Sequence, residues 1–258
     1  MDKKGIFFDL YGTLFIFGDM TTAWNDWANT YYETLTKCGH KIQKDNLYES
    51  LSGFFSKPRP DIDNQELTLY EYRLRNHCSS INLELATDEL QQLSASTITA
   101  WQNHILLDNE TIPVLKKLKE NFTIALVSNF DHPPHIYSLL SNLELISLFD
   151  EIIISGEVGY DKPHTKIFET ALTQTKRKAD EVLFVGDSVE DMEGAKAVGL
   201  TPVLINRERN SENSVLIDFQ SDPDSIEHVQ PTPDKNGVIE ISSLNELLTI
   251  VYKVEQNG

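Results

Sequence analysis

The chain has 258 residues, of which 40% are hydrophobic, enough for one large core or one core plus a smaller appended unit. Its formal net charge is −18 at pH 7, and its lysines and arginines form no long basic block. Such a field repels nucleic-acid phosphates and anionic lipid headgroups, so neither nucleic acid nor a membrane is an expected partner. The first apolar run is too short for a signal peptide, and no stretch approaches the roughly 20 apolar residues of a membrane span. Cys38 and Cys78 lack metal-ligand spacing. We therefore expect a soluble, cytoplasmic protein with two free thiols.

The chain begins with a short apolar run that ends in an acid. Residues 6–8 are Ile-Phe-Phe, Asp9 follows, and Gly12 and Thr13 come within four residues. An apolar run of this length bounded by a glycine turn is typical of a buried strand. Ligands of open α/β sheets bind beyond the carboxyl ends of the strands, which is where Asp9 is expected. A carboxylate buried there requires a positive partner, either a metal ion or a lysine.

A helical pattern then runs from about Thr21 to Leu107, without a strong β run. Apolar residues at three- and four-residue steps predict four helices. These helices are expected around residues 24–35, 47–55 and 67–78, and from 87 towards 106. The aromatic face of the first helix, from Trp24 to Tyr32, is predicted to form the core of this block rather than the wall of a substrate site.

From Thr111 onwards, strands and helices alternate. Strands are expected at residues 122–128, 151–155, 182–186 and 202–205, and helices at 112–119, 136–143, 165–175 and 191–198. Strands that are apolar on both faces and alternate with helices indicate βαβ units and a parallel sheet. The polar and acidic residues 207–237 predict a long surface loop. A short edge strand at 238–241 and a closing helix at 244–254 are expected after it.

Polar residues gather at four strand ends or shortly after them. They are Asp9 and Thr13 in the first group, Ser128 and Asn129 in the second, Lys162 in the third, and Asp187 and Asp191 in the fourth. Each group alone has a common structural explanation, because Ser-Asn forms turns, Lys-Pro opens helices and acids favour a first helical turn. Parallel strands, however, place all four groups on one edge of the sheet.

In this order the four groups resemble the four motifs of the haloacid dehalogenase superfamily of hydrolases, most of which are magnesium-dependent phosphatases. The resemblance covers residues 4–16 and 110–205. It implies a Rossmann-like parallel sheet with helices on both faces, built from residues 1–17 and 108–258. It also implies an inserted α-helical cap domain over residues 18–107, which would close over the active site to exclude water.

The resemblance further implies a metal site. Asp9 would be the nucleophile, attacking phosphorus to give an aspartyl-phosphate that water hydrolyses. Mg²⁺ would be held by Asp9, by the main-chain carbonyl of Tyr11 and by Asp187. Asp191 would act in the second shell, holding a metal-bound water. The expected substrate is a small phosphoester.

The remaining positions are implied to serve charge balance and phosphate binding. Lys162 would offset the clustered carboxylates and keep the nucleophile ionised. Thr13 and Ser128 would donate to the phosphoryl oxygens, and Asn129 would either share that role or anchor its loop. Positioning and charge stabilisation are most of what phosphoryl transfer requires of a protein.

The sequence departs from the phosphatases of this family at Tyr11, where they usually carry a second aspartate that serves as general acid and base. A phenol with a reference pKa of about 10 is a poor proton donor by comparison. An Asp-x-Tyr-Gly-Thr start is also seen in the family's 2-haloacid dehalogenases, in which the nucleophile attacks carbon without a metal. Asp187 weighs against that alternative, as does the lack of any arginine before Arg59, because those enzymes use an early cap arginine. A third alternative is a non-catalytic binding or regulatory protein of the same fold.

Overall fold

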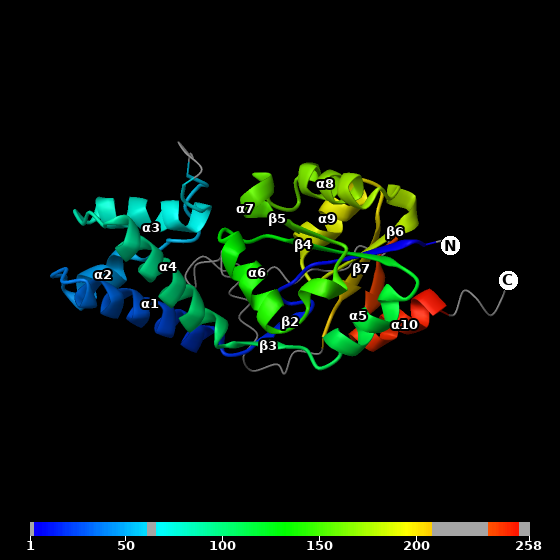
Figure 1. Cartoon of the computed structure of the whole chain (residues 1–258), viewed down its shortest axis with the longest axis horizontal. Helices are drawn as coiled ribbons and strands as arrows, with labels where there is room; N and C mark the ends of the chain where they lie inside the picture. Colours follow the sequence, from blue (N-terminus) through cyan, green and yellow to red (C-terminus); the bar gives the residue numbers. More distant parts are fainter. Residues whose placement is uncertain (1–2, 61–65, 208–236, 253–258) are drawn as a thin grey trace. The chain divides into compact units, whose positions relative to one another are not determined.

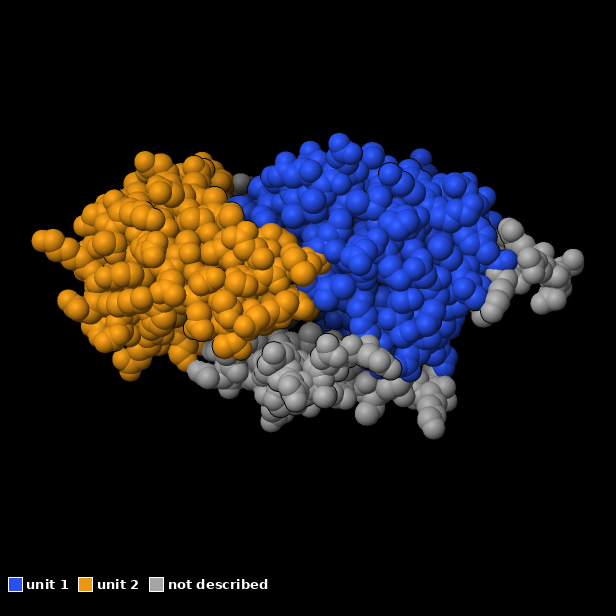
Figure 2. All heavy atoms as spheres, turned by 90° about the horizontal axis from the view of Figure 1, so that it is seen from below, with its two compact units in different colours: residues 1–16, 107–209, 230–258 blue, residues 17–106, 210–229 orange. Residues whose placement is uncertain are grey.

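The computed structural model describes residues 3–60, 66–207 and 237–252. These residues fold into two compact units, coloured separately in Figure 2. Among the described residues, one unit, here called the sheet unit, comprises residues 3–16, 107–207 and 237–252, and the other, the helical unit, comprises residues 17–60 and 66–106. Apart from its first and last residues, the predicted surface loop 207–237 lies outside the described residues.

The sheet unit is built on a six-stranded sheet in which every strand pairs in parallel, in the order β5-β4-β1-β6-β7-β8. The strands are β1 (Gly5–Phe8), β4 (Thr123–Ser128), β5 (Glu151–Ile154), β6 (Val182–Gly186), β7 (Thr201–Ile205) and β8 (Ile239–Ile241). The central strands β1 and β6 are buried at every residue, as expected for apolar runs covered on both faces. The predicted parallel sheet and Rossmann-like α/β fold are confirmed.

Helices cover both faces of this sheet, with α8 and α9 on one side and α5 and α10 on the other (Figure 1). The helices of the unit are α5 (Thr111–Lys119), α6 (Pro133–Asn142), α7 (Ser155–Val158), α8 (Thr165–Thr175), α9 (Val189–Ala197) and α10 (Leu244–Tyr252), with 3-10 turns η1 (Ile146–Leu148) and η2 (Ala179–Glu181). Phe168 of α8 packs on Phe184 of β6 in the core, with ring centroids 5.0 Å apart. A Cβ atom on Gly194 would lie 2.2 Å from the Phe168 ring, so glycine is required for α9 to pack this closely on α8.

The helical unit contains α1 (Met20–Lys37), α2 (Lys44–Ser50), α3 (Leu69–Ser80) and α4 (Thr87–Gln102). Two predicted ends were wrong. The second helix stops at Ser50 rather than continuing to Phe55, and residues 51–56 form turns. The fourth helix ends at Gln102 instead of running towards Leu106, because residues 105–107 form a strand.

That strand, β3 (Ile105–Leu107), pairs with β2 (Phe15–Phe17) in a two-stranded ribbon. The Gly18 N–H donates to the His104 carbonyl (2.9 Å), and the Asp108 N–H donates to the Leu14 carbonyl (3.1 Å). This pairing with a distant segment satisfies backbone groups that a longer helix would otherwise satisfy itself, and it overrides the local helical pattern.

Aromatic side chains fill the core of the helical unit, as predicted for the first helix. Trp27 and Tyr31 are fully buried. The indole N–H of Trp27 donates to the hydroxyl of Tyr70 (2.8 Å), which is itself hydrogen-bonded to Thr97 (2.7 Å). These buried polar atoms are therefore satisfied inside the core. Within the described residues, no helix of either unit combines the length and the apolar character needed to cross a bilayer.

Candidate active site

The predicted site residues converge at the carboxyl ends of three adjacent strands, β4, β1 and β6. Phe8 of β1 pairs with Leu126 of β4 and with Val185 of β6. The next residue, Asp9, therefore emerges between the ends of both neighbours, and its N–H donates to the Val185 carbonyl (2.9 Å). The sheet order alone thus brings the first, second and fourth sequence groups together.

Three carboxylates form the centre of this edge. Asp9, Asp187 and Asp191 each offer an oxygen, and these atoms lie within 4.8 Å of one another. Asp9 and Asp191 are buried and Asp187 is half-buried. Like charges held this close repel one another strongly in a buried site, so the arrangement requires positive charge.

The start of α9 explains how Asp191 reaches the cluster. Ser188 caps the helix, and its hydroxyl accepts from the Asp191 N–H (3.2 Å) while the Asp191 carboxylate accepts from the Ser188 N–H (3.2 Å). This reciprocal capping box fixes the Asp191 side chain at the helix N-terminus, where the helix dipole also favours a carboxylate.

Lys162 supplies one positive charge to the cluster. Its ammonium forms a buried ion pair with Asp9 and another with Asp191, the latter at 2.7 Å. Burial alone would lower the pKa of Lys162, but the carboxylates of Asp191 and Asp9 outweigh that effect and hold the pKa above its usual value. The lysine is therefore fully charged at neutral pH.

The ion pairs of Lys162 reach two of the three carboxylates, Asp9 and Asp191. Burial raises the pKa of Asp9 to about 7; Lys162 opposes this rise and Asp191 adds to it. Because the ionised carboxylate is the nucleophile, further positive charge near Asp9 would favour its reactive form. A cluster of carboxylate oxygens is also the donor set that Mg²⁺ prefers. The residues at this edge therefore fit a divalent metal ion.

Two glycines make the close approach of the carboxylates feasible. A Cβ atom on Gly12 would lie 2.1 Å from an oxygen of Asp187, and one on Gly186 would lie 2.4 Å from an oxygen of Asp191. Gly12 also has φ +89°, a conformation that strains any other residue. The next residue, Thr13, is fully buried, and its hydroxyl donates to Asp187 (3.3 Å).

The two residues of the second sequence group, Ser128 and Asn129, have different surroundings. Ser128 is buried at the end of β4. Asn129 is bound to the backbone of Lys162 in both directions: its amide N–H donates to the Lys162 carbonyl (3.2 Å), and its amide oxygen accepts from the Lys162 N–H (2.8 Å). Of the two roles expected for Asn129, this geometry favours anchoring the segment that carries the lysine.

The ring of Tyr11 packs in an aromatic cluster. Its ring centroid is 5.9 Å from that of Phe15 and 5.6 Å from that of Phe130, and the residue is 9% exposed. The side chain two residues after Asp9 therefore has a packing environment in the sheet unit, which is consistent with its predicted lack of an acid–base role.

Two residues at this edge were missed by the sequence analysis. Arg207 donates to the carbonyls of Gly12 and Thr13 and forms an ion pair with Asp108 (2.6 Å). The signal available was its position: it comes two residues after a strand whose carboxyl end lies on the same sheet edge as the other groups.

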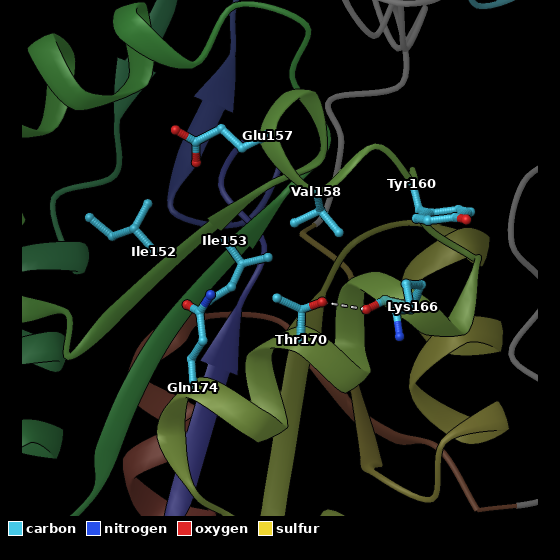
Figure 3. A pocket seen from close by; sticks show the side chains of 8 residues that line it. All are labelled: Ile152, Ile153, Glu157, Val158, Tyr160, Lys166, Thr170 and Gln174. Carbon is cyan, nitrogen blue, oxygen red and sulfur yellow. Dashed lines mark hydrogen bonds between the residues drawn. The ribbon is translucent and has the colours of Figure 1, made fainter. Parts of the chain in front are cut away.

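A surface pocket elsewhere in the sheet unit is separate from this site. It has a volume of about 310 Å³ and is lined by residues of β5, α7, α8 and the segment between the two helices, including Ile153, Tyr160 and Lys166. Figure 3 shows these side chains around it, and none of the residues labelled there is a predicted site residue. We therefore do not connect this pocket with the chemistry at Asp9.

Comparison with known proteins identifies a family that this chain matches. The family model for haloacid dehalogenase-like hydrolases matches residues 3–199. Among curated proteins, an (S)-2-haloacid dehalogenase of Pseudomonas fluorescens is 23% identical over 210 residues, covering 81% of this chain and 86% of the relative. A glyceraldehyde 3-phosphate phosphatase of Methanothermobacter thermautotrophicus is 34% identical over 115 residues, covering 42% and 44% of the two chains.

A solved structure supports the fold over nearly the whole chain. The crystal structure of a HAD phosphatase from Thermococcus onnurineus matches with a TM-score of 0.62 and 24% identity, covering 96% of this chain and 98% of that one. The relatives therefore include both phosphatases and dehalogenases.

Proposed function

The chain belongs to the haloacid dehalogenase-like hydrolase family, and we propose that it is a Mg²⁺-dependent hydrolase of a small phosphorylated molecule with Asp9 as its nucleophile. The observation that carries this proposal is the third carboxylate, Asp187, which lies within 4.8 Å of Asp9 and Asp191. Attack on carbon without a metal gains nothing from an additional negative charge beside the nucleophile. A divalent cation, by contrast, requires such a set of oxygen ligands.

The reaction would proceed in two displacements at phosphorus. A carboxylate oxygen of Asp9 attacks phosphorus as the bond to the leaving oxygen breaks, which gives an aspartyl-phosphate and the departing alcohol. Water then attacks the same phosphorus, the bond to Asp9 breaks, and inorganic phosphate leaves. The nucleophile is regenerated, and the proton lost by water balances the proton gained by the alcohol.

The residues of the site have separate tasks in this scheme. Lys162 holds the Asp9 carboxylate in place and offsets its charge. Thr13 and Ser128 donate hydrogen bonds to the phosphoryl oxygens. Mg²⁺ would be held by Asp9, the Tyr11 main-chain carbonyl and Asp187, with Asp191 in the second shell. When bound, it would neutralise charge that develops on the transferred phosphoryl group.

Tyr11 favours a substrate whose leaving group departs without a proton. Its phenol has a reference pKa of about 10 and its ring packs against Phe15 and Phe130, so it is a poor general acid. Aryl and acyl phosphates have leaving groups of low pKa and depart as anions. They are the substrate types that this site would hydrolyse fastest.

Dehalogenation of a 2-haloacid is the second candidate, favoured by Tyr11 and by the dehalogenase relative that matches 86% of its own length. Here Asp9 would attack carbon as the carbon–halogen bond breaks and halide departs. Water would then hydrolyse the resulting ester. This chemistry does not use the Asp187 carboxylate, so we place dehalogenation second.

The two candidates are separated by one set of assays. Hydrolysis of p-nitrophenyl phosphate, of an alkyl phosphate and of 2-chloropropionate is measured with Mg²⁺ and with EDTA. The variants are Asp9→Asn and, as a control on an exposed aspartate, Asp180→Asn. We expect Mg²⁺-dependent turnover of the aryl ester that survives Asp180→Asn and is lost in Asp9→Asn. Halide release in EDTA would instead support the dehalogenase, and no turnover of any compound would favour a binding or regulatory protein.

A further inference from the structure

Arg207 binds the backbone of the loop that follows Asp9. One terminal nitrogen of its guanidinium, Nη1, donates to the Gly12 carbonyl at 2.6 Å, and the other, Nη2, donates to the Thr13 carbonyl at 2.6 Å. Its side chain is 19% exposed, so these hydrogen bonds are largely shielded from water. A planar guanidinium is rigid, and binding two consecutive carbonyls fixes the orientation of both peptide planes.

These two hydrogen bonds determine which backbone group faces away from Arg207 on the opposite side of the turn. The carbonyl and N–H of a trans peptide point in opposite directions, so holding the Gly12 carbonyl turns the N–H of Thr13 away from Arg207. Asp187 is also in contact with this turn, close to the Gly12 Cα and to the Thr13 hydroxyl. The Gly12–Thr13 peptide is therefore held between Arg207 and the carboxylate cluster.

Asp108 holds the arginine in turn. Its carboxylate accepts from Arg207 Nη2 at 2.6 Å and from the N–H of Glu110 at 2.8 Å, at the start of α5. The Asp108 N–H donates to the Leu14 carbonyl (3.1 Å). The pair is nearly neutral overall, so Arg207 contributes geometry rather than uncompensated charge, whereas Lys162 contributes charge.

We propose that Arg207 is a positioning residue. It fixes the Gly12–Thr13 peptide so that the N–H of Thr13 faces the phosphoryl group that Asp9 attacks. This inference rests on the proposed phosphoester hydrolysis. It requires the two-pronged arginine itself, because a lysine ammonium is a point charge that does not impose the same fixed geometry on both carbonyls.

The test compares Arg207→Ala and Arg207→Lys with a matched control, Arg177→Ala. Arg177 also makes two hydrogen bonds, both to the Thr123 hydroxyl, but at the amino end of β4, away from the site. With p-nitrophenyl phosphate and Mg²⁺, we expect kcat to fall roughly 10- to 100-fold in both Arg207 variants, as is typical for misplaced catalytic groups. The KM of both Arg207 variants is expected to stay within about threefold of the wild-type value. Arg177→Ala is expected to keep the wild-type kcat. Added methylguanidinium is expected to restore part of the kcat of Arg207→Ala.

Full activity in Arg207→Lys would overturn the proposal, because charge rather than orientation would then be the cause. A kcat for Arg207→Ala equal to that of Arg177→Ala would overturn it as well.

A second readout does not depend on activity. The N–H groups of Gly12, Leu14 and Phe15 are hydrogen-bonded within the turn. Hydrogen–deuterium exchange of the peptide covering residues 9–15 is expected to be at least about tenfold faster in Arg207→Ala than in Arg177→Ala. Unchanged exchange would overturn the proposal even if kcat fell. If the wild type hydrolyses no phosphoester, the proposed function fails, and the exchange result still decides whether Arg207 holds the turn.

Discussion

Gly12→Ala is the substitution whose effect can be worked out most fully from the structure. Two costs arise. Alanine at φ +89° is strained by about 1–2 kcal/mol, which lowers stability. Its Cβ would also lie 2.1 Å from an oxygen of Asp187, far inside van der Waals contact, so the carboxylate must move by roughly 1 Å.

The second cost falls on activity. A misplacement of this size in a catalytic constellation typically lowers the rate by about 10²-fold. We therefore expect kcat/KM for p-nitrophenyl phosphate to fall about 100-fold in Gly12→Ala. Because Asp187 is the displaced group, the Mg²⁺ concentration that gives half-maximal rate is expected to rise as well.

Gly199→Ala is the matched control. Gly199 has φ +85°, but its added Cβ would meet only the Ala179 side chain, at an ordinary 3.6 Å. Both variants should lose stability through backbone strain, measured by thermal unfolding, with a larger loss in Gly12→Ala because of its clash, while only Gly12→Ala loses activity. Equal activity in the two variants would refute the idea that Gly12 exists to admit Asp187.

Three further predictions concern the buried polar groups. Burial lowers the pKa of His77 to about 4 in the folded protein, whereas the unfolded chain takes up this proton near pH 6.5. The unfolding free energy of the helical unit should therefore fall by up to roughly 3 kcal/mol as the pH drops from 6.5 to 4. Urea titrations followed by tryptophan fluorescence report on this unit, which holds all three tryptophans, and the effect should vanish in His77→Asn. Lys162→Met leaves two buried carboxylates without their ammonium and should lower the unfolding free energy by about 3–5 kcal/mol in EDTA, with partial recovery in Mg²⁺. Unfolding followed by circular dichroism measures this change, and unchanged stability would contradict the buried ion pairs. Asn129→Ala removes both hydrogen bonds to the Lys162 backbone and should lower kcat roughly tenfold, so an unaltered kcat would argue against the anchoring role.

Most of the sheet unit could be predicted from the sequence because its signals are local and strong. The apolar run at residues 182–186 and the amphipathic pattern at 165–175 were found with the same bounds as β6 and α8. Once the strands are known to be parallel, their carboxyl ends must share an edge. The gathering of Asp9 and Asp187 there follows from the order of the strands.

The remaining features depend on partners far away in the chain. Residues 105–107 continue the apolar spacing of the preceding helix, yet they form a strand because residues 15–17 offer backbone partners. Arg207 and Asp108 are 99 residues apart and carry no motif that links them. The short helix α7 has a single turn, too little for a periodic pattern. Such contacts become visible only when the fold is known.

The central claim is that Asp9, Asp187 and Asp191 hold a divalent cation. Titration with Mn²⁺ as a substitute for Mg²⁺, followed by the loss of the electron paramagnetic resonance signal of the free ion, tests it without any assumption about the substrate. We predict one ion bound per chain in the wild type and at least about tenfold weaker binding in Asp187→Asn, with Asp180→Asn unchanged. A wild type that binds no ion, or an Asp187→Asn variant that binds it equally well, would contradict the account.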